Sequence, residues 1–80
     1  MIVAVEISLY PLNDNFEKPV DTFLKLLSVN KNINVEPGKM SSVIIGELSE
    51  IMSTLNVAIK EVFNSNQAVF NLKVSNCCPL

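Results

Sequence analysis

Hydrophobic and polar residues alternate along the first ten residues of the chain. One set of alternate positions is wholly aliphatic and comprises Val3, Val5, Ile7 and Leu9. The other set is mixed and comprises Ala4, Glu6, Ser8 and Tyr10. Successive side chains of a strand point to opposite sides of a sheet, so this pattern predicts a strand over Ile2–Tyr10 with one face on a core. Pro11 is expected to end it.

Two later segments repeat their apolar residues at the spacing of an α-helix. In the first segment these residues are Phe16, Val20, Phe23, Leu24 and Leu27. Asp14, with Glu17 three residues later, has the spacing of a capping box, and Pro19 fits a helix only in its first turn. In the second segment the apolar residues are Ile51, Met52, Leu55, Ile59, Val62 and Phe63. We expect Ser49 to cap this second helix and Asn64–Asn66 to end it.

Three further strands are expected. A short one surrounds Ile33 and Val35, and the Pro37-Gly38 turn returns the chain into a second one over Met40–Leu48. In Met40–Leu48 the alternation places Val43 and Ile45 on one face and Met40, Ser42, Ile44 and Gly46 on the other. The last strand covers Ala68–Ser75, with Phe70, Leu72 and Val74 on one face and Val69, Asn71 and Lys73 on the other.

The order strand, helix, strand, strand, helix, strand predicts a ferredoxin-like βαββαβ fold of the α+β class, formed by residues 1–80 as a single domain. It has a four-stranded antiparallel sheet with both helices on one face. The helix-free side of the sheet is called the open face below. The side chains expected on it are Ala4, Glu6, Ser8, Tyr10, Ser42, Ile44, Gly46 and Asn71. This set is too apolar to be left fully in water, so we expect oligomerisation and function to be decided there.

Composition and charge limit the classes of partner. The chain is 49% hydrophobic and 18% charged, which favours a packed domain over disorder. Its net charge is -2 and its six cations, all lysines, are scattered, so nucleic acid is not an expected partner. No apolar run approaches the length of about twenty residues that crosses a bilayer. The N-terminal segment has no basic region or cleavage site, and the expected location is therefore cytoplasmic.

The sequence offers little for catalysis or metal binding. It contains no histidine, the usual general base and metal ligand. Adjacent Cys77 and Cys78 would form a strained disulfide, and two ligands make a poor zinc site, so both are interpreted as reduced thiols. We therefore expect neither an enzyme nor a bound metal or cofactor.

Glu6 is the most informative polar residue, because glutamate is disfavoured within a strand. A buried carboxylate needs a partner, which is either a lysine of a second subunit, such as Lys73, or an amine or cation of a ligand. Together with Ser8, Tyr10, Ser42 and Asn71, Glu6 forms a convergent polar set in apolar surroundings.

Four stretches of the sequence are similar to a known family: residues 7–12 (Ile-Ser-Leu-Tyr-Pro-Leu), residues 14–16 (Asp-Asn-Phe), residues 40–47 (Met-Ser-Ser-Val-Ile-Ile-Gly-Glu) and Cys78-Pro79. In their order and spacing they resemble the YkoF-like thiamine and hydroxymethylpyrimidine-binding proteins, over about Val5–Pro79. The resemblance implies a domain that binds a thiamine-type ligand without chemistry, as a carrier, sensor or salvage accessory. By position it implies roles for Ser8, Tyr10, Ser41, Ser42 and Asn71. The larger members fuse two such domains, so a single copy is expected to form a homodimer or tetramer.

The ligand-binding residues expected from the open face and the resemblance together are Glu6, Ser8, Tyr10, Ser41, Ser42, Ile44 and Asn71. A carboxylate suits the amine of an aminopyrimidine, hydroxyls and an amide suit its ring nitrogens, and Tyr10 offers a stacking surface. The alternative is an ACT-like regulatory or adaptor domain that binds an amino acid or a protein. A small enzyme that uses Glu6 or Lys73 is a third reading.

Overall fold

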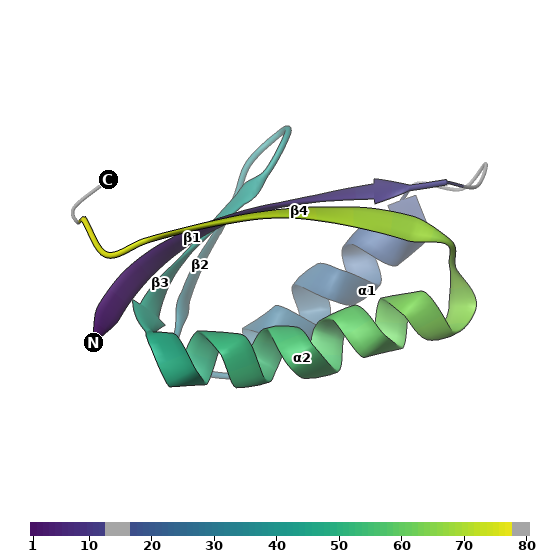
Figure 1. Ribbon diagram of the computed structural model, residues 1–80. Helices are drawn as coiled ribbons and strands as arrows, with labels where there is room; N and C mark the ends of the chain where they lie inside the picture. The colour runs from purple at the N-terminus through teal and green to yellow at the C-terminus, as the bar shows by residue number, and fades with distance from the viewer. Residues whose placement is uncertain (13–16, 78–80) are drawn as a thin grey trace.

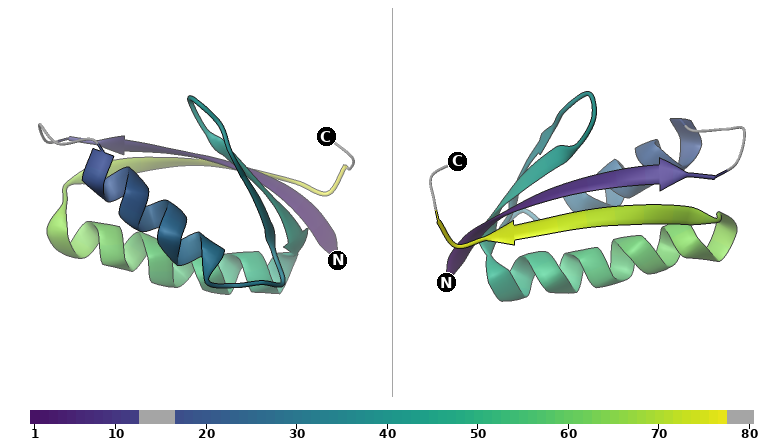
Figure 2. Two further views of the ribbon diagram at one scale, coloured as in Figure 1. Left: turned by 180° about the vertical axis from the view of Figure 1, so that it is seen from behind. Right: turned by 45° about the horizontal axis from the view of Figure 1, so that its top comes forward.

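The computed structural model describes residues 1–12 and 17–77. The elements in chain order are β1 (Ile2–Pro11), α1 (Glu17–Ser28), β2 (Asn34–Pro37), β3 (Ser42–Glu47), α2 (Leu48–Ser65) and β4 (Ala68–Ser75). The strands form one antiparallel sheet in the order β2-β3-β1-β4. Both helices lie on the same side of it (Figures 1 and 2). The predicted ferredoxin-like α+β fold is therefore confirmed.

The core fills the space between the sheet and the two helices. It is built from three aliphatic side chains of β1, one side chain of β3, the inward stripes of the helices and one residue just before β2: Val3, Val5, Ile7, Ile44, Phe23, Leu27, Ile51, Leu55, Ala58, Val62 and Ile33. Phe70 of β4 extends it, because its ring lies 5.0 Å from that of Phe23 and 5.5 Å from that of Phe63. Phe63, expected in the buried stripe, is half-exposed, whereas Ala58, which was not expected there, is buried.

The start of α2 differs from expectation, whereas the start of α1 agrees with it where it is described. Pro19 is the third residue of α1, within the first turn as predicted, while the proposed cap Asp14 lies outside the described residues. In contrast, α2 begins at Leu48 after the N-cap Glu47, so the prediction that Ser49 caps it is wrong. The side chain of Glu47 makes no capping hydrogen bond; it accepts one from the Met1 ammonium at 2.6 Å. The strand thus runs directly into the helix.

The β2–β3 hairpin turns where Pro37-Gly38 predicted it. The Gly38 N–H donates to the Ser41 carbonyl at 2.9 Å. A Cβ at residue 38 would stand 2.6 Å from that carbonyl oxygen, so this tight turn requires glycine. Ser41 is thereby fixed at the first position before β3, beside the end of the hairpin.

The strand register decides which residues face the helices, and it overturns one expectation. Val5 lies directly opposite Ile44, and Ile7 lies opposite Ser42. Residues directly opposite in an antiparallel pair share a face, so Ser42, Ile44 and Gly46 lie on the helix-covered side. Val43 and Ile45 lie on the open face. The placement of Ser42, Ile44 and Gly46 on the open face was therefore wrong, and the whole strand is inverted relative to that prediction.

Gly46 is consistent with this register, because it faces the buried Ile33. A Cβ there would stand 3.1 Å from Cγ2 of the buried Ile33. A side chain at residue 46 would require Ile33 to move by a few tenths of an ångström, so glycine favours the close packing of the segment before β2 on β3. Gly46 therefore lies on the core side of β3, where Ile33 packs against it.

Candidate functional site

Glu6 stands in the middle of the open face. It lies on β1, one of the two inner strands of the sheet, opposite Val43 of β3 and Lys73 of β4. The Ser41 hydroxyl donates to Oε2 of Glu6 at 3.1 Å, and Nζ of Lys73 lies 3.6 Å from Oε1. These three residues, Glu6, Ser41 and Lys73, are called the Glu6 cluster. Side chains from β4 and from the residue just before β3 therefore converge on one carboxylate of β1.

The cluster is accessible to solvent. The Glu6 side chain is 44% exposed and that of Lys73 is 76% exposed. An ion pair this exposed contributes about 0–1 kcal/mol, because water and salt screen it and two long side chains must be held in place. The pair can therefore open at little cost. The partner of Glu6 was expected from a second subunit or a ligand, and the structure supplies Lys73 of the same chain.

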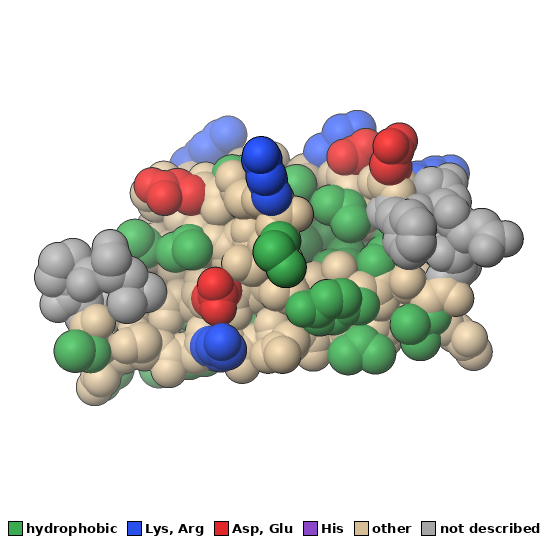
Figure 3. Space-filling view, turned by 90° about the horizontal axis from the view of Figure 1, so that it is seen from above, with side chains coloured by type: hydrophobic (Ala, Val, Ile, Leu, Met, Phe, Trp, Pro, Cys, Tyr) green, Lys and Arg blue, Asp and Glu red, His purple; other side chains and the backbone are tan. Residues whose placement is uncertain are grey.

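A hollow of about 410 Å³ adjoins the cluster, and its lining residues are Ala4, Glu6, Val43, Lys73 and Ser75. Ala4 is only 1% exposed although it belongs to the open face. The small side chains of Ala4 and Ser75 lie directly opposite each other on β1 and β4 and form the floor. Figure 3 shows acidic and basic side chains adjoining on this face among hydrophobic ones. The arrangement can hold a flat apolar ring with a hydrogen-bond donor aimed at Glu6.

The remaining polar residues predicted on this face lie farther along β1 and β4. Ser8 is directly opposite Asn71, and Tyr10 is opposite Val69. Tyr10 is half-exposed, and its ring is available to solvent. The structure thus brings Ser41 to Glu6 and pairs Ser8 with Asn71, with both groups on the open face.

Two predicted site residues do not lie there. Ile44 is completely buried in the core, and Ser42, with 9% exposure, lies opposite Ile7 on the helix-covered side. Neither side chain can contact a ligand on the open face. The residues that sequence reasoning left out of the site are Ala4, Val43, Lys73 and Ser75. Alternation had already placed Ala4 on the open face and Lys73 on the same face of its strand as Asn71. The position of Val43 depends instead on the strand register, which the alternation within a single strand does not contain.

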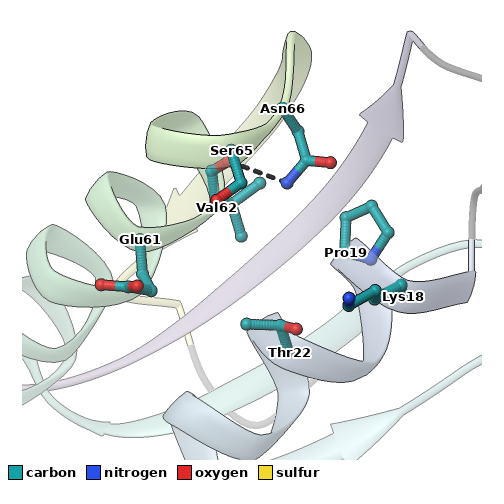
Figure 4. Close-up of a pocket in the computed structure, with 7 residues that line it drawn as sticks. All are labelled: Lys18, Pro19, Thr22, Glu61, Val62, Ser65 and Asn66. Atoms are coloured by element: carbon teal, nitrogen blue, oxygen red, sulfur yellow. Dashed lines mark hydrogen bonds between the residues drawn. The ribbon is translucent and has the colours of Figure 1, made fainter.

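A second hollow, of about 470 Å³, lies between α1 and α2 (Figure 4). Its lining residues are Lys18, Pro19, Thr22, Glu61, Val62, Ser65 and Asn66. The Asn66 amide donates to the Val62 carbonyl at 3.0 Å and so serves the end of α2. The charged groups here lie on exposed helix positions. The Glu6 cluster, in contrast, is centred on a strand and receives a hydrogen bond, so we place the candidate site on the open face.

The metal and thiol expectations concern a different part of the chain. Cys77 is a free, exposed thiol, and Cys78 lies outside the described residues. Within residues 1–12 and 17–77, no group of three or more His, Cys, Asp or Glu side chains is positioned to hold a metal ion. Within the same residues, none of the helices is both long and apolar enough to span a membrane.

Fold and site together define the class of protein: a ferredoxin-like domain that carries the Glu6 cluster and a hollow on its open face. No family model and no curated protein matches the sequence. Solved structures do. The hypothetical protein MJ1052 of Methanocaldococcus jannascii is 26% identical, with a TM-score of 0.84 over 99% of this chain and 84% of that one.

Two other similar structures come from bacteria. The Thermotoga maritima protein TM0486, assigned provisionally to thiamine biosynthesis or salvage, is 19% identical, with a TM-score of 0.83 over 94% of this chain and 83% of that one. A domain of unknown function, DUF77, from Bacillus cereus is 17% identical, with a TM-score of 0.77 over 92% of this chain and 74% of that one. At these identities the two likenesses show the shared fold.

Proposed function

We propose that this chain binds thiamine or its hydroxymethylpyrimidine moiety, without chemistry, at the hollow beside Glu6, as a cytoplasmic carrier, sensor or salvage accessory. The single observation that carries the proposal is the Glu6 cluster: a solvent-accessible carboxylate in the middle of a sheet, next to a hollow with an apolar wall. Glutamate is uncommon within strands, so the position of Glu6 in the middle of β1 supports a binding role. Two further points support the thiamine-type ligand: the sequence resemblance and the provisional assignment of one structurally similar protein.

The ligand chemistry fits the cluster. An aminopyrimidine presents an exocyclic amine flanked by ring nitrogens. Glu6 accepts from the amine in this proposal, and Val43 and Ala4 line the hollow beside the ring. Ser8, Asn71 and Tyr10 lie on the other side of Glu6 along β1 and β4, so they meet the part of a longer ligand that extends out of the hollow. Ser42 and Ile44 have no part in it.

We also propose that copies of the chain share the open face, as a dimer or tetramer. Half-exposed apolar side chains lie on it, namely Ile2, Tyr10 and Val69. A ligand on a flat sheet is covered on one side only, and a second copy would enclose it.

The test is calorimetric titration with thiamine and with hydroxymethylpyrimidine. Glu6→Gln should weaken binding about tenfold or more, since a hydrogen bond to a charged group contributes about 1.5–3 kcal/mol. Glu36→Gln is the matched control, because Glu36 lies in the same row of the open face, opposite Val43, and carries the same charge. It should change affinity by less than about threefold.

The proposal has clear failing outcomes. No heat and no thermal shift with either ligand at millimolar concentration would contradict it. Equal losses for Glu6→Gln and Glu36→Gln would show that only the overall charge of the face matters. A thermal shift with amino acids and none with thiamine would instead favour the ACT-like regulatory domain.

A further inference from the structure

Lys73 neutralises Glu6 without filling its hydrogen-bonding positions. The distance of 3.6 Å from Nζ to Oε1 is within ion-pair range but longer than the roughly 2.7–2.9 Å of a direct charge-assisted hydrogen bond. The Ser41 hydroxyl is bound to the other oxygen, Oε2. Oε1 therefore retains acceptor capacity while its charge is balanced by the ammonium beside it.

This geometry treats two kinds of ligand differently. An uncharged N–H donor can reach Oε1 while Lys73 stays in place, because the two need not share a position. A permanent cation in the hollow meets the ammonium of Lys73, which lines the same hollow, and is repelled by it. It must displace Lys73 to gain the full attraction of Glu6.

We propose that Lys73 sets the charge selectivity of the hollow, so that the hollow favours an uncharged amino-heterocycle of the hydroxymethylpyrimidine type over the thiazolium cation of thiamine. This inference rests on the proposed function and deepens it by naming the ligand class. Two other carboxylates lie on the open face. Glu36 lies in the same row as Glu6, and Glu47 is paired with the Met1 ammonium. Without Lys73, the carboxylates of Glu6 and Glu36 would make this row attractive to cations.

The experiment compares ligands that differ only in charge. Thiamine and its thiophene isostere, in which the thiazolium is replaced by a neutral ring, are titrated calorimetrically above neutral pH together with hydroxymethylpyrimidine. The wild-type chain should bind the neutral isostere more tightly than thiamine. Lys73→Met should shift the affinity ratio toward thiamine by about two- to fivefold, the size expected of one exposed charge. Added salt should reduce the shift, because it screens the charge.

Controls separate the local charge from other effects. Lys73→Gln should shift the affinity ratio as Lys73→Met does. Lys73→Arg should leave the ratio at the wild-type value, because arginine keeps the positive charge. Lys60→Met removes an exposed lysine of α2, on the opposite side of the sheet, and should leave the ratio unchanged.

The failures of the two proposals are distinguishable. The role of Lys73 is overturned if the wild type prefers thiamine, or if Lys73→Met and Lys73→Gln leave the affinity ratio unchanged. The proposed function still holds in that case if hydroxymethylpyrimidine binds. If folded wild-type and Lys73→Met chains bind none of the three ligands, the proposed function fails and this inference fails with it.

Discussion

Ser41 and Ser42 are neighbours in the sequence but belong to opposite faces of the sheet. The Ser41 hydroxyl donates to Glu6, while Ser42 lies on the helix-covered side, opposite Ile7. Ser41→Ala should therefore weaken ligand binding about two- to tenfold, as the loss of one hydrogen bond of about 0.5–1.5 kcal/mol implies. Calorimetric titration of the single variants measures it.

Ser42→Ala is the matched control for that prediction. It removes the same hydroxyl one residue away and should leave affinity unchanged, because its side chain does not reach the open face. Urea unfolding should show Ser41→Ala as stable as the wild type. A loss of affinity for Ser42→Ala as large as that for Ser41→Ala would mean that the ligand does not lie on the open face.

At the scale of elements, one side chain joins the loop after α1 to the first turns of α2. The Asn30 amide donates to Oε1 of Glu50 at 3.0 Å and to Oγ1 of Thr54 at 2.9 Å, in a partly buried place. Asn30→Ala removes both bonds, together with the one that Oδ1 of Asn30 accepts from the Asn32 N–H at 2.9 Å, and leaves Glu50 with fewer partners. Its free energy of unfolding should fall by about 1–3 kcal/mol, measured by urea denaturation.

Asn56→Ala provides the comparison for the Asn30 variant. Asn56 is exposed on α2, and alanine has the higher helix propensity there. The free energy of unfolding should thus change by no more than about 0.5 kcal/mol in either direction. Equal effects of the two substitutions would mean that the Asn30 bonds do not hold the helices together.

The whole molecule has one side covered by helices and one side bare. If copies pair through the bare side, a charge placed there should prevent it. Val69→Glu on the open face should lower the sedimentation-derived molar mass to that of the monomer, since a desolvated unpaired carboxylate at an interface is strongly unfavourable.

Val57→Glu gives the corresponding change on the helical side. Val57 is an exposed valine of α2, so a glutamate there should leave the assembly intact. A wild-type chain that sediments as a monomer at every concentration would contradict shared open faces. An effect of Val57→Glu alone would move the interface to the helices.

The sequence by itself determined the type and order of the elements, and it determined the faces of β1. In β1 the two alternate sets differ sharply, because Val3, Val5 and Ile7 are aliphatic while Glu6 and Ser8 are polar. Burial of the aliphatic set is therefore worth far more than burial of the other, and only one orientation is stable. The Pro37-Gly38 turn and the period of both helices have equally local causes, and for this reason they were predictable.

Only the tertiary structure decided the orientation of β3 and the composition of the site. In β3 both alternate sets contain aliphatic residues, Ile44 in one and Val43 with Ile45 in the other, so alternation does not choose between them. The choice comes from pairing with β1 and from the space that Ile33 needs beside Gly46. Lys73 and Ser41 reach Glu6 from positions 67 and 35 residues away in the chain. Such contacts depend on register and packing, which act between segments and leave no trace in the pattern of any one of them.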